Sequence, residues 1–272
     1  MNIQLVAPPL DLRFLIQGYW YADAASVKHP TYRIFSDGYP GLIFQHVQGN
    51  PGLFRGTDVL PLCFIYGQKS KGFCLNECEA GTLFFGIQFQ PYAFKQLMGI
   101  DASVLTDCCL DARELFRGLA IEPLVEFEHW MSFVSYFNAY FRTLNCRVEQ
   151  NPYIIPIVSN FDSYFTFSSS QVAQMHHVSA RKFQRDFKSY VGLSFEAYRQ
   201  LIKFQKAAYC LKKHPETKIV DIAYALYYAD QAHFGRIFKF YSGYTPKEFM
   251  DKQWNYNESE VIHHSRLRIL SQ

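Results

Sequence analysis

The sequence of 272 residues lacks several patterns that identify particular classes of protein. No apolar run approaches the roughly 18 residues of a membrane-spanning helix, and no basic and apolar leader opens the chain at Met1. No GxSxG, GxxxxGK[ST] or GxGxxG motif is present, and Ser, His and Asp show no informative spacing. We therefore expect a cytoplasmic protein that is not an enzyme, with no cofactor and no membrane partner.

The cysteines lack the arrangement of a disulfide framework or a zinc site. The chain has seven cysteines, and this odd number, sparse for a chain of this length, suits a reducing cytoplasm better than a disulfide framework. Cys74 and Cys78 form a Cx3C pair, and together with the vicinal Cys108 and Cys109 they could supply four thiolates. However, vicinal cysteines rarely chelate one ion together, and no CxxC is present. We expect ordinary thiols and no metal, and a thiol- or metal-responsive sensor remains an alternative.

The net charge of +3 is distributed unevenly along the chain. Residues 161–253 hold 14 Lys and Arg against 8 Asp and Glu, whereas residues 1–160 hold 11 against 14. Positive charge gathered in one part of a protein is what binding to nucleic-acid phosphates requires. The distribution favours a nucleic-acid partner for the C-terminal part.

That part contains a pattern of two short helices joined by a turn. A helix is expected at about residues 168–175, followed by a turn at 176–178. Ser179 is a good N-cap for the next helix, on which Phe183 and Phe187 stand four apart on one face. One face of this second helix packs, and the other faces carry positive charge.

The same pattern occurs again about fifty residues later. Residues 219–226 give a short apolar stripe, a turn follows at 227–229, and Asp230 caps another helix. Phe234 and Phe238 repeat the four-residue spacing. Both copies end at a glycine that serves as a helix stop signal, Gly192 and Gly243.

Residues 194–211, between the copies, have the pattern of one continuous helix. At 1.5 Å per residue it is about 27 Å long. It can hold two recognition helices about one DNA turn, or roughly 34 Å, apart, so that both enter successive major grooves. A monomer could then read a site that usually needs a dimer.

Residues 168–249, about a third of the chain, resemble the DNA-binding domain of AraC/XylS-type transcription regulators, whose hallmark is IAxxxGFxxxxxFxRxFKxxxGxTPxxY. Two departures are visible: Tyr227 replaces the usual turn glycine, and Phe195 stands where a proline is common. A left-handed turn at Tyr227 costs about 1 kcal/mol more than glycine would. The matching or conservatively replaced residues are Ile222, Ala223, Tyr228, Phe234, Arg236, Phe238, Lys239, Gly243, Thr245, Pro246 and Phe249 in the second copy, and Ser179, Phe183, Arg185, Phe187, Lys188, Gly192, Ser194 and Tyr198 in the first.

The resemblance implies which side chains contact DNA. Arg can donate two hydrogen bonds to guanine and Gln can pair with adenine, whereas phosphate contacts fix the register without reading sequence. The alternative, a merely solvated charged face, is disfavoured by the two aligned copies. The implied base readers are Arg181, Gln184, Arg185, Gln231, Ala232, His233 and Arg236, and the implied phosphate contacts are Ser179, Lys182, Lys188, Lys203 and Lys239.

The N-terminal part has the pattern of a β-rich barrel or sandwich. Aromatic and β-branched runs punctuated by Gly and Pro predict strands at residues 14–21, 32–35, 41–47, 59–66 and 82–89. Two of these runs, DGYPGLIFQHV and GTLFFGIQFQPYAFKQLMGI, resemble the cupin-like sensor module of one subgroup of these regulators, more weakly than the C-terminal match. In that family such a module commonly binds a small effector or forms the dimer.

No effector-binding residue is identified by the sequence. Aromatic residues on strands are usually core, and only His46 and Gln88 suggest themselves as polar groups of a cavity. A catalytic cupin needs a cluster of His and Glu ligands, yet the first 105 residues contain only His29 and His46. An enzyme with an appended DNA-binding domain is the remaining alternative of another class.

An apolar stripe predicts helices at about residues 108–148. Packing on the sensor sheet is the simpler interpretation of the stripe, and a dimer seam is compatible with it. The stripe consists of Phe127, Trp130, Met131, Val134, Phe137, Phe141 and Leu144.

Together these patterns predict an α+β protein. Residues 1–150 form a β-rich sensor or dimerisation domain with following helices, 151–253 a double helix-turn-helix domain with a long joining helix, and 254–272 a polar tail. The predicted function is a sequence-specific bacterial transcription regulator, with activation the commoner role in the family. The expected partners are double-stranded promoter DNA, RNA polymerase, a small-molecule effector and a second copy of the chain.

Overall fold

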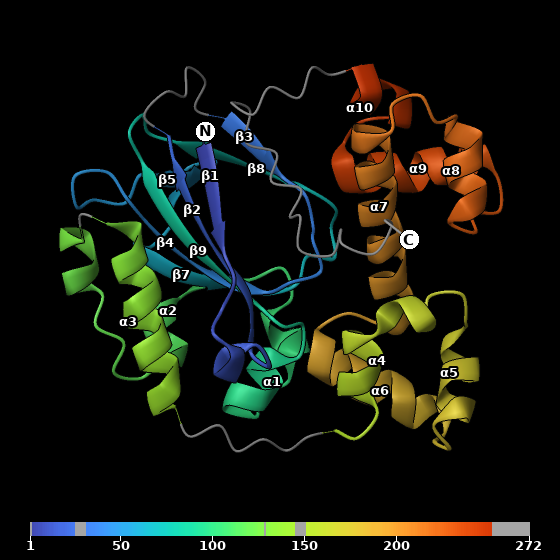
Figure 1. Cartoon of the computed structure of the whole chain (residues 1–272), viewed down its shortest axis with the longest axis horizontal. Helices are drawn as coiled ribbons and strands as arrows, with labels where there is room; N and C mark the ends of the chain where they lie inside the picture. Colours follow the sequence, from blue (N-terminus) through green and yellow to red (C-terminus); the bar gives the residue numbers. More distant parts are fainter. Residues whose placement is uncertain (1, 25–30, 128, 145–150, 252–272) are drawn as a thin grey trace.

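The computed structural model describes residues 2–24, 31–127, 129–144 and 151–251 (Figure 1). Its N-terminal part contains β-sheets and short helices, and its C-terminal part is helical. The predicted α+β class is therefore confirmed. The predicted tail at 254–272 lies outside the described residues. Among the residues described, no helix is both long and apolar enough to cross a membrane.

The N-terminal strands form two antiparallel sheets. The larger has the strand order β1-β2-β9-β4-β7-β10, and the smaller has the order β3-β8-β5-β6. The strands are β1 (Asn2–Val6), β2 (Ile16–Asp23), β3 (Thr31–Ile34), β4 (Gly41–His46), β5 (Leu53–Arg55), β6 (Asp58–Val59), β7 (Cys63–Tyr66), β8 (Cys74–Cys78), β9 (Leu83–Phe89) and β10 (Cys109–Asp111).

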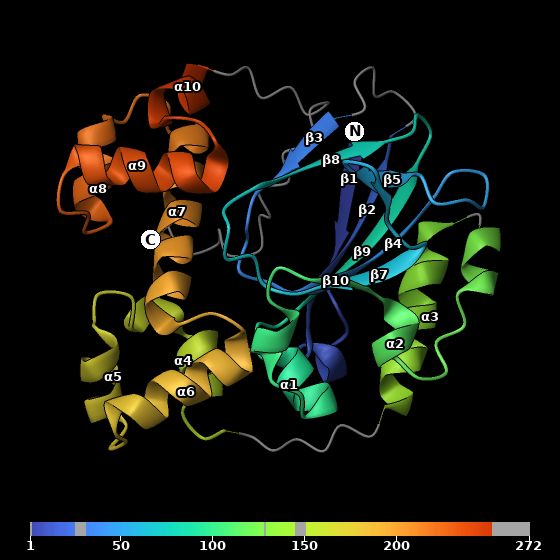
Figure 2. The ribbon, with the colours of Figure 1, turned by 180° about the vertical axis from the view of Figure 1, so that it is seen from behind.

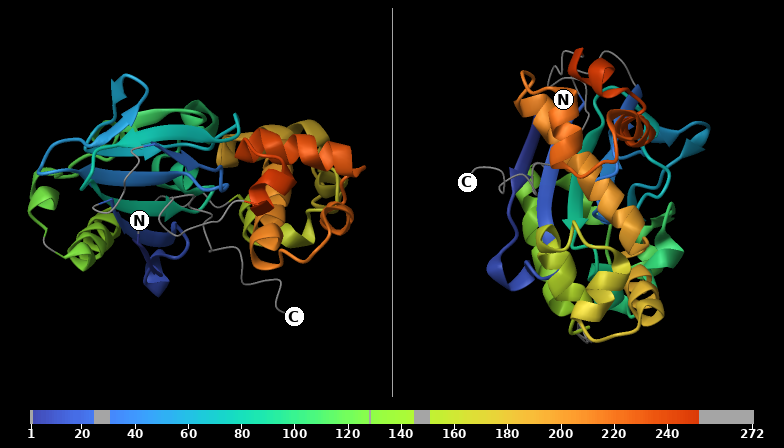
Figure 3. Two further views of the ribbon diagram at one scale, coloured as in Figure 1. Left: turned by 90° about the horizontal axis from the view of Figure 1, so that it is seen from above. Right: turned by 90° about the vertical axis from the view of Figure 1, so that its right-hand side faces the viewer.

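The central strands β4 and β9 of the larger sheet are buried on both faces because their residues alternate between two cores. Leu42 and Phe44 of β4 join a core on the helix side, whereas Ile43 between them joins a core on the side of the smaller sheet. Trp20 belongs to the second core and is paired in register with Gly86. The N-terminal part thus has three layers: small sheet, large sheet and helices (Figure 3).

The helix layer is formed mainly by α3 (Trp130–Thr143), with α1 (Ala93–Met98) and α2 (Ala112–Leu115) beside it. The ring of Phe85 on the sheet lies 5.0 Å from that of Phe133 and 5.6 Å from that of Phe137. Met131, which the sequence placed in the same stripe, is 46 % exposed. The predicted stripe therefore packs on the sheet, as expected. The helix itself begins at Trp130, and Phe127 precedes it but still packs on this core, with its ring 5.1 Å from that of Phe133.

The C-terminal part consists of helices around one aromatic core. The predicted long helix is confirmed as α7 (Phe195–Lys213). Every predicted helix and both glycine stops are confirmed, since Gly192 and Gly243 adopt left-handed conformations (φ 88° and 77°). The helices are α4 (Ile154–Ser159), α5 (Ser169–Met175), α6 (Ala180–Val191), α7 (Phe195–Lys213), α8 (Ile219–Ala225), α9 (Gln231–Ser242) and α10 (Pro246–Asp251).

The strand predictions are partly right. The runs at 41–47 and 82–89 became β4 and β9, but the run at 59–66 became two strands in different sheets, β6 and β7. Pro61 lies between them, and a proline cannot donate to the hydrogen-bond ladder of a continuous strand. The polar strand β8, the short interior strand β5 and the edge strands β1 and β10 were missed.

The turns inside both helix-turn-helix units are left-handed at residues other than glycine. His177 in the first unit has φ 53° and Tyr227 in the second has φ 55°. A side chain in this region costs about 1–2 kcal/mol relative to glycine. The strain expected at Tyr227 is therefore present, and the first unit has it as well.

Replacing Tyr227 by glycine is expected to raise the free energy of unfolding by about 0.5–1 kcal/mol, because glycine adopts this conformation without strain. The matched control is Tyr224→Gly in α8, where the tyrosine is 82 % exposed and helical; it is expected to lower stability by about 0.5 kcal/mol. Urea denaturation of both variants measures the difference. Equal destabilisation by the two substitutions would show that the turn is not strained.

Candidate nucleic-acid interface and ligand pocket

The first helix-turn-helix unit consists of α5 and α6. One face of α6 packs against the helical core and holds the helix in place. The Ser179 hydroxyl accepts a hydrogen bond from the Lys182 backbone N–H at 3.3 Å, so the predicted N-cap is confirmed. Phe183 and Phe187 have no exposed surface. The opposite face of α6 is left to solvent.

The second unit, α8 and α9, has the same design. The Asp230 carboxylate accepts from the His233 backbone N–H at 2.6 Å and caps α9. Phe234 and Phe238 are fully buried, like their counterparts in the first unit. The two copies thus present equivalent outer faces.

Helix α7 connects the two units and packs into both. Phe195, which replaces the common proline, is buried with its ring 5.5 Å from that of Phe183 and 5.3 Å from that of Phe187. Near the other unit, the ring of Phe204 lies 5.2 Å from that of Phe238. Figure 2 shows α6 and α9 beside opposite ends of α7. The departure at Phe195 therefore contributes packing that fixes α6.

Most of the predicted base readers lie on the outer faces of these helices. His233 is the exception, half-buried with its ring 5.7 Å from that of Tyr228. Their contacts with DNA remain a prediction. The exposed readers are Arg181, Gln184 and Arg185 on α6, and Gln231, Ala232 and Arg236 on α9.

An acidic residue on α6 binds two of the basic ones. The Asp186 carboxylate lies 2.5 Å from Lys182 Nζ and 3.3 Å from Arg185 Nε, and it also accepts from the Tyr153 hydroxyl. Partial burial raises the pKa of Asp186, but the hydrogen bonds from Lys182 and Tyr153 outweigh it and lower the pKa overall. Asp186 stays charged and orients both cations on the exposed face of α6.

Of the predicted phosphate contacts, Ser179, Lys182, Lys188 and Lys239 are exposed, but Lys203 is not. Lys203 is only 5 % exposed, and its ammonium donates to the Tyr227 carbonyl at 2.9 Å. The same ammonium lies 5.1 Å from the centre of the Tyr228 ring. Lys203 therefore supports the strained turn of the second unit, and its assignment as a phosphate contact is wrong.

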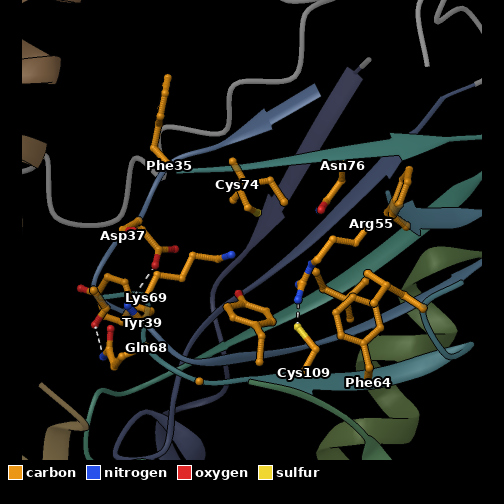
Figure 4. A pocket seen from close by; sticks show the side chains of 18 of the residues that line it. Phe35, Asp37, Tyr39, Arg55, Phe64, Gln68, Lys69, Cys74, Asn76 and Cys109 are labelled. Atoms are coloured by element: carbon orange, nitrogen blue, oxygen red, sulfur yellow. Dashed lines mark hydrogen bonds between the residues drawn. The ribbon is translucent and has the colours of Figure 1, made fainter. Parts of the chain in front are cut away.

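A cavity of about 70 Å³ lies between the two N-terminal sheets (Figure 4). One water needs roughly 10–15 Å³ on this measure, so the cavity has room for several waters or one small molecule. The large sheet contributes Trp20, Ile43, Phe64, Phe84 and Cys109, and the small sheet contributes Ile34, Arg55, Cys74 and Asn76.

The polar side chains of this cavity differ from those suggested by the sequence. His46 does not line it; its Nδ1 accepts from the Gly49 N–H at 3.2 Å in a turn. Gln88 is not among the lining residues, but it donates at 2.7 Å to the carboxylate of Asp37, which is one of them. Arg55 was missed, although the two-residue alternation of a strand places it on the same face as the buried Leu53.

The cysteines considered as a metal site are not brought together. Cys74 and Cys78 lie at opposite ends of β8, about 13 Å apart at 3.3 Å per residue, which is too far for one ion. Cys109 is in β10 of the other sheet, and its Sγ accepts from Arg55 Nη2 at 2.9 Å. Among the described residues, no three His, Cys, Asp or Glu side chains form a group that could hold a metal.

Both parts of the chain match known family models. Residues 172–252 match a helix-turn-helix domain, and residues 4–111 match a domain of unknown function (DUF6597).

Curated relatives match about a quarter of the chain. The transcriptional regulator MtrA of Neisseria gonorrhoeae is 38 % identical over 63 residues, which are 23 % of this chain and 21 % of MtrA. The transcriptional activator RhaS of Escherichia coli is 30 % identical over 77 residues, 28 % of this chain and 27 % of RhaS. The chain therefore spans about a quarter of the length of these relatives.

Solved structures match from about a third to most of the chain. The C-terminal domain of AraT from Geobacillus stearothermophilus is 24 % identical, with 39 % of this chain and 93 % of that domain covered and a TM-score of 0.36. ToxT from Vibrio cholerae is 13 % identical, with 87 % and 99 % covered and a TM-score of 0.43.

The helix-turn-helix match covers the residues whose caps, aromatic spacing and glycine stops were described above. The two curated relatives reported above are named as a transcriptional regulator and a transcriptional activator. Two complete units on one connecting helix distinguish it from a single helix-turn-helix motif. The C-terminal part of this chain is a DNA-binding domain of the AraC/XylS family of transcription regulators.

Proposed function

We propose that the whole chain is a sequence-specific activator of transcription, in which α6 and α9 read promoter DNA and the N-terminal pocket receives a small effector. The observation that carries the proposal is the pair of equivalent helices, each fixed by two buried phenylalanines and each presenting Arg and Gln to solvent. The proposed activity is DNA binding and not catalysis. The protein is expected to act in the cytoplasm, with RNA polymerase as its protein partner.

The length of α7 supports simultaneous binding in two grooves. Its 19 residues span about 28 Å, close to the roughly 34 Å of one DNA turn. Both recognition helices pack against this rigid helix, so their spacing is set before DNA is bound. One copy of the chain suffices for two major grooves, and a homodimer would double the site.

Two segments that line the pocket lead into contacts with the DNA-binding domain. The first is residues 35–39, and the second begins at residues 67–69. The Ser36 carbonyl accepts from the Gln205 amide of α7. Gln68 of the second segment donates to the Gly38 carbonyl at 2.8 Å, and Gly72, four residues on, lies against the Phe240 carbonyl of α9. A ligand that moves either segment therefore acts on the helices that hold DNA.

Selection of bound sequences from random duplex DNA tests the proposed reading of DNA. Full-length protein is expected to enrich two sequence blocks about 10 base pairs apart, because each recognition helix reads one major groove. Affinity should fall steeply as salt increases, through the phosphate contacts. Salt-sensitive binding without an enriched sequence would leave only a phosphate-binding surface and would contradict the proposal.

Arg236→Ala is expected to reduce discrimination at one base position by about 1–3 kcal/mol, because the exposed arginine of α9 can pair bidentately with guanine. Lys239→Ala on the same helix should weaken binding to all sequences about equally. Lys213→Ala at the exposed end of α7 is the control and should change neither. Binding titrations on the selected site and its single-base variants measure all three, and an unchanged base preference would remove Arg236 from the readers.

Gly72→Ala tests the contact between the pocket-lining segment and α9. An added Cβ would lie 2.2 Å from the Phe240 carbonyl oxygen, so the contact must open. We expect DNA affinity to fall several-fold. Gly56→Ala is a matched control, because Gly56 also has positive φ (59° against 81°) but nothing lies within 4 Å of its added Cβ. Equal DNA affinities of the two variants would show that this contact does not influence α9.

A further inference from the structure

We propose that the pocket between the two sheets binds a small organic carboxylate, with its anionic group on Arg55 and its apolar body among the aromatic side chains of the large sheet. The identity of this ligand as the effector rests on the proposed function, but its binding does not.

Arg55 has an unused donor inside the pocket. Its Nη2 donates to Cys109 Sγ at 2.9 Å, while its Nε–H is buried and has no hydrogen-bond acceptor among the residues that the structure describes. Arginine remains charged at any physiological pH and offers several donors in one plane. A carboxylate matches this arrangement better than a neutral acceptor does, because charge-assisted hydrogen bonds are the stronger ones.

Asn76 requires a hydrogen-bond donor from the ligand, whereas Arg55 requires an acceptor. It is buried on β8, and its Oδ1 has no donor within the described part of the chain. Arg55 and Asn76 both line the same pocket. A ligand that satisfies both carries an acceptor for the guanidinium and a donor, such as a hydroxyl, for the amide oxygen.

The charge of the lining favours an anion. Arg55 and Lys69 carry positive charge, and Asp37 is the one carboxylate in the set of residues that lines this pocket. In Figure 4 the Lys69 side chain extends towards Arg55 from the opposite side. The Asp37 carboxylate accepts from the neutral Gln88 amide, and the three charged groups together leave the lining with a net positive charge, which favours an anion.

The side chains that line the pocket favour a ligand whose uncharged part is apolar and of limited size. Trp20 lies across from Gly86, where any Cβ would come within 1.9 Å of the indole, so the glycine is what allows the flat wall. Ile43, Phe64 and Phe84 complete an apolar surface that an inorganic anion would leave uncovered. The volume of about 70 Å³ suits a molecule with a single ring and not a nucleotide.

The proposal is tested by calorimetric titration of the full chain with benzoate and the three hydroxybenzoate isomers. Benzamide is the uncharged counterpart of benzoate, and inorganic phosphate is an anion without an apolar body. We expect the carboxylates to bind, with one hydroxybenzoate isomer tighter than benzoate, and benzamide and phosphate at least tenfold weaker. The proposal is overturned if none of the carboxylates binds at millimolar concentration, or if benzamide or phosphate binds as well as they do.

Variants locate the site. Arg55→Gln is expected to weaken carboxylate binding at least tenfold, whereas Arg117→Gln, the same change at an exposed position, should leave it unchanged. Arg55→Lys keeps the charge without the planar fork and should give an intermediate affinity. Asn76→Leu should abolish the preference for the hydroxyl while retaining benzoate. Thermal unfolding verifies that each variant is folded, and undiminished binding by both folded Arg55 variants would overturn the assignment.

A separate titration with promoter DNA distinguishes this proposal from the proposed function. Carboxylate binding that depends on Arg55 establishes the pocket even when the chain shows no sequence-specific DNA binding, in which case the regulator assignment fails alone. Sequence-specific DNA binding together with no carboxylate binding overturns the pocket proposal and leaves the regulator assignment standing.

Discussion

The packing of one phenylalanine side chain ties the two parts of this molecule together. Phe35 follows β3 of the sensor-like part, yet its buried ring lies 6.1 Å from the rings of both Phe204 and Phe249 in the helical core. The next residues, Ser36 to Gly38, line the pocket between the sheets. One short segment therefore belongs at once to the core of the DNA-binding domain and to the wall of the pocket, and neither can rearrange without it.

The close contacts around this segment leave little room for gradual movement. A Cβ at Gly38 would lie 3.3 Å from the Tyr198 ring of α7, and one at Gly192 would lie 3.0 Å from the Thr106 hydroxyl oxygen. Thr106 also donates to the Gly192 carbonyl, at 2.8 Å, where α6 ends. Packed interfaces of this kind change between discrete arrangements and do not deform continuously. A ligand influences DNA binding only through a difference in its affinity for two such arrangements.

How much could be predicted from the sequence depended on how local the determining contacts are. Caps at Ser179 and Asp230 and phenylalanines four residues apart act within one helix, and α5 to α9 were predicted to within about two residues, whereas α4 and α10 were not predicted. The pocket was not, because Arg55 and Asn76 meet only through the pairing of β5 with β8 and the stacking of that sheet on another. The prediction that Lys203 contacts phosphate was wrong for the same reason. Nothing in the local sequence distinguishes a lysine that faces DNA from one that faces a neighbouring turn.

The left-handed turns show how the second unit keeps its shape without the usual glycine. Tyr227 is 64 % exposed, so burial of its side chain does not explain the strained backbone. Its carbonyl instead accepts from the ammonium of Lys203, which burial among aromatic rings holds in one place and whose pKa that burial lowers. A charged donor at this carbonyl offsets part of the cost of the turn. The buried lysine thus stabilises the turn that precedes α9. The orientation of α9, and with it the position of the exposed Arg236, depends on this turn.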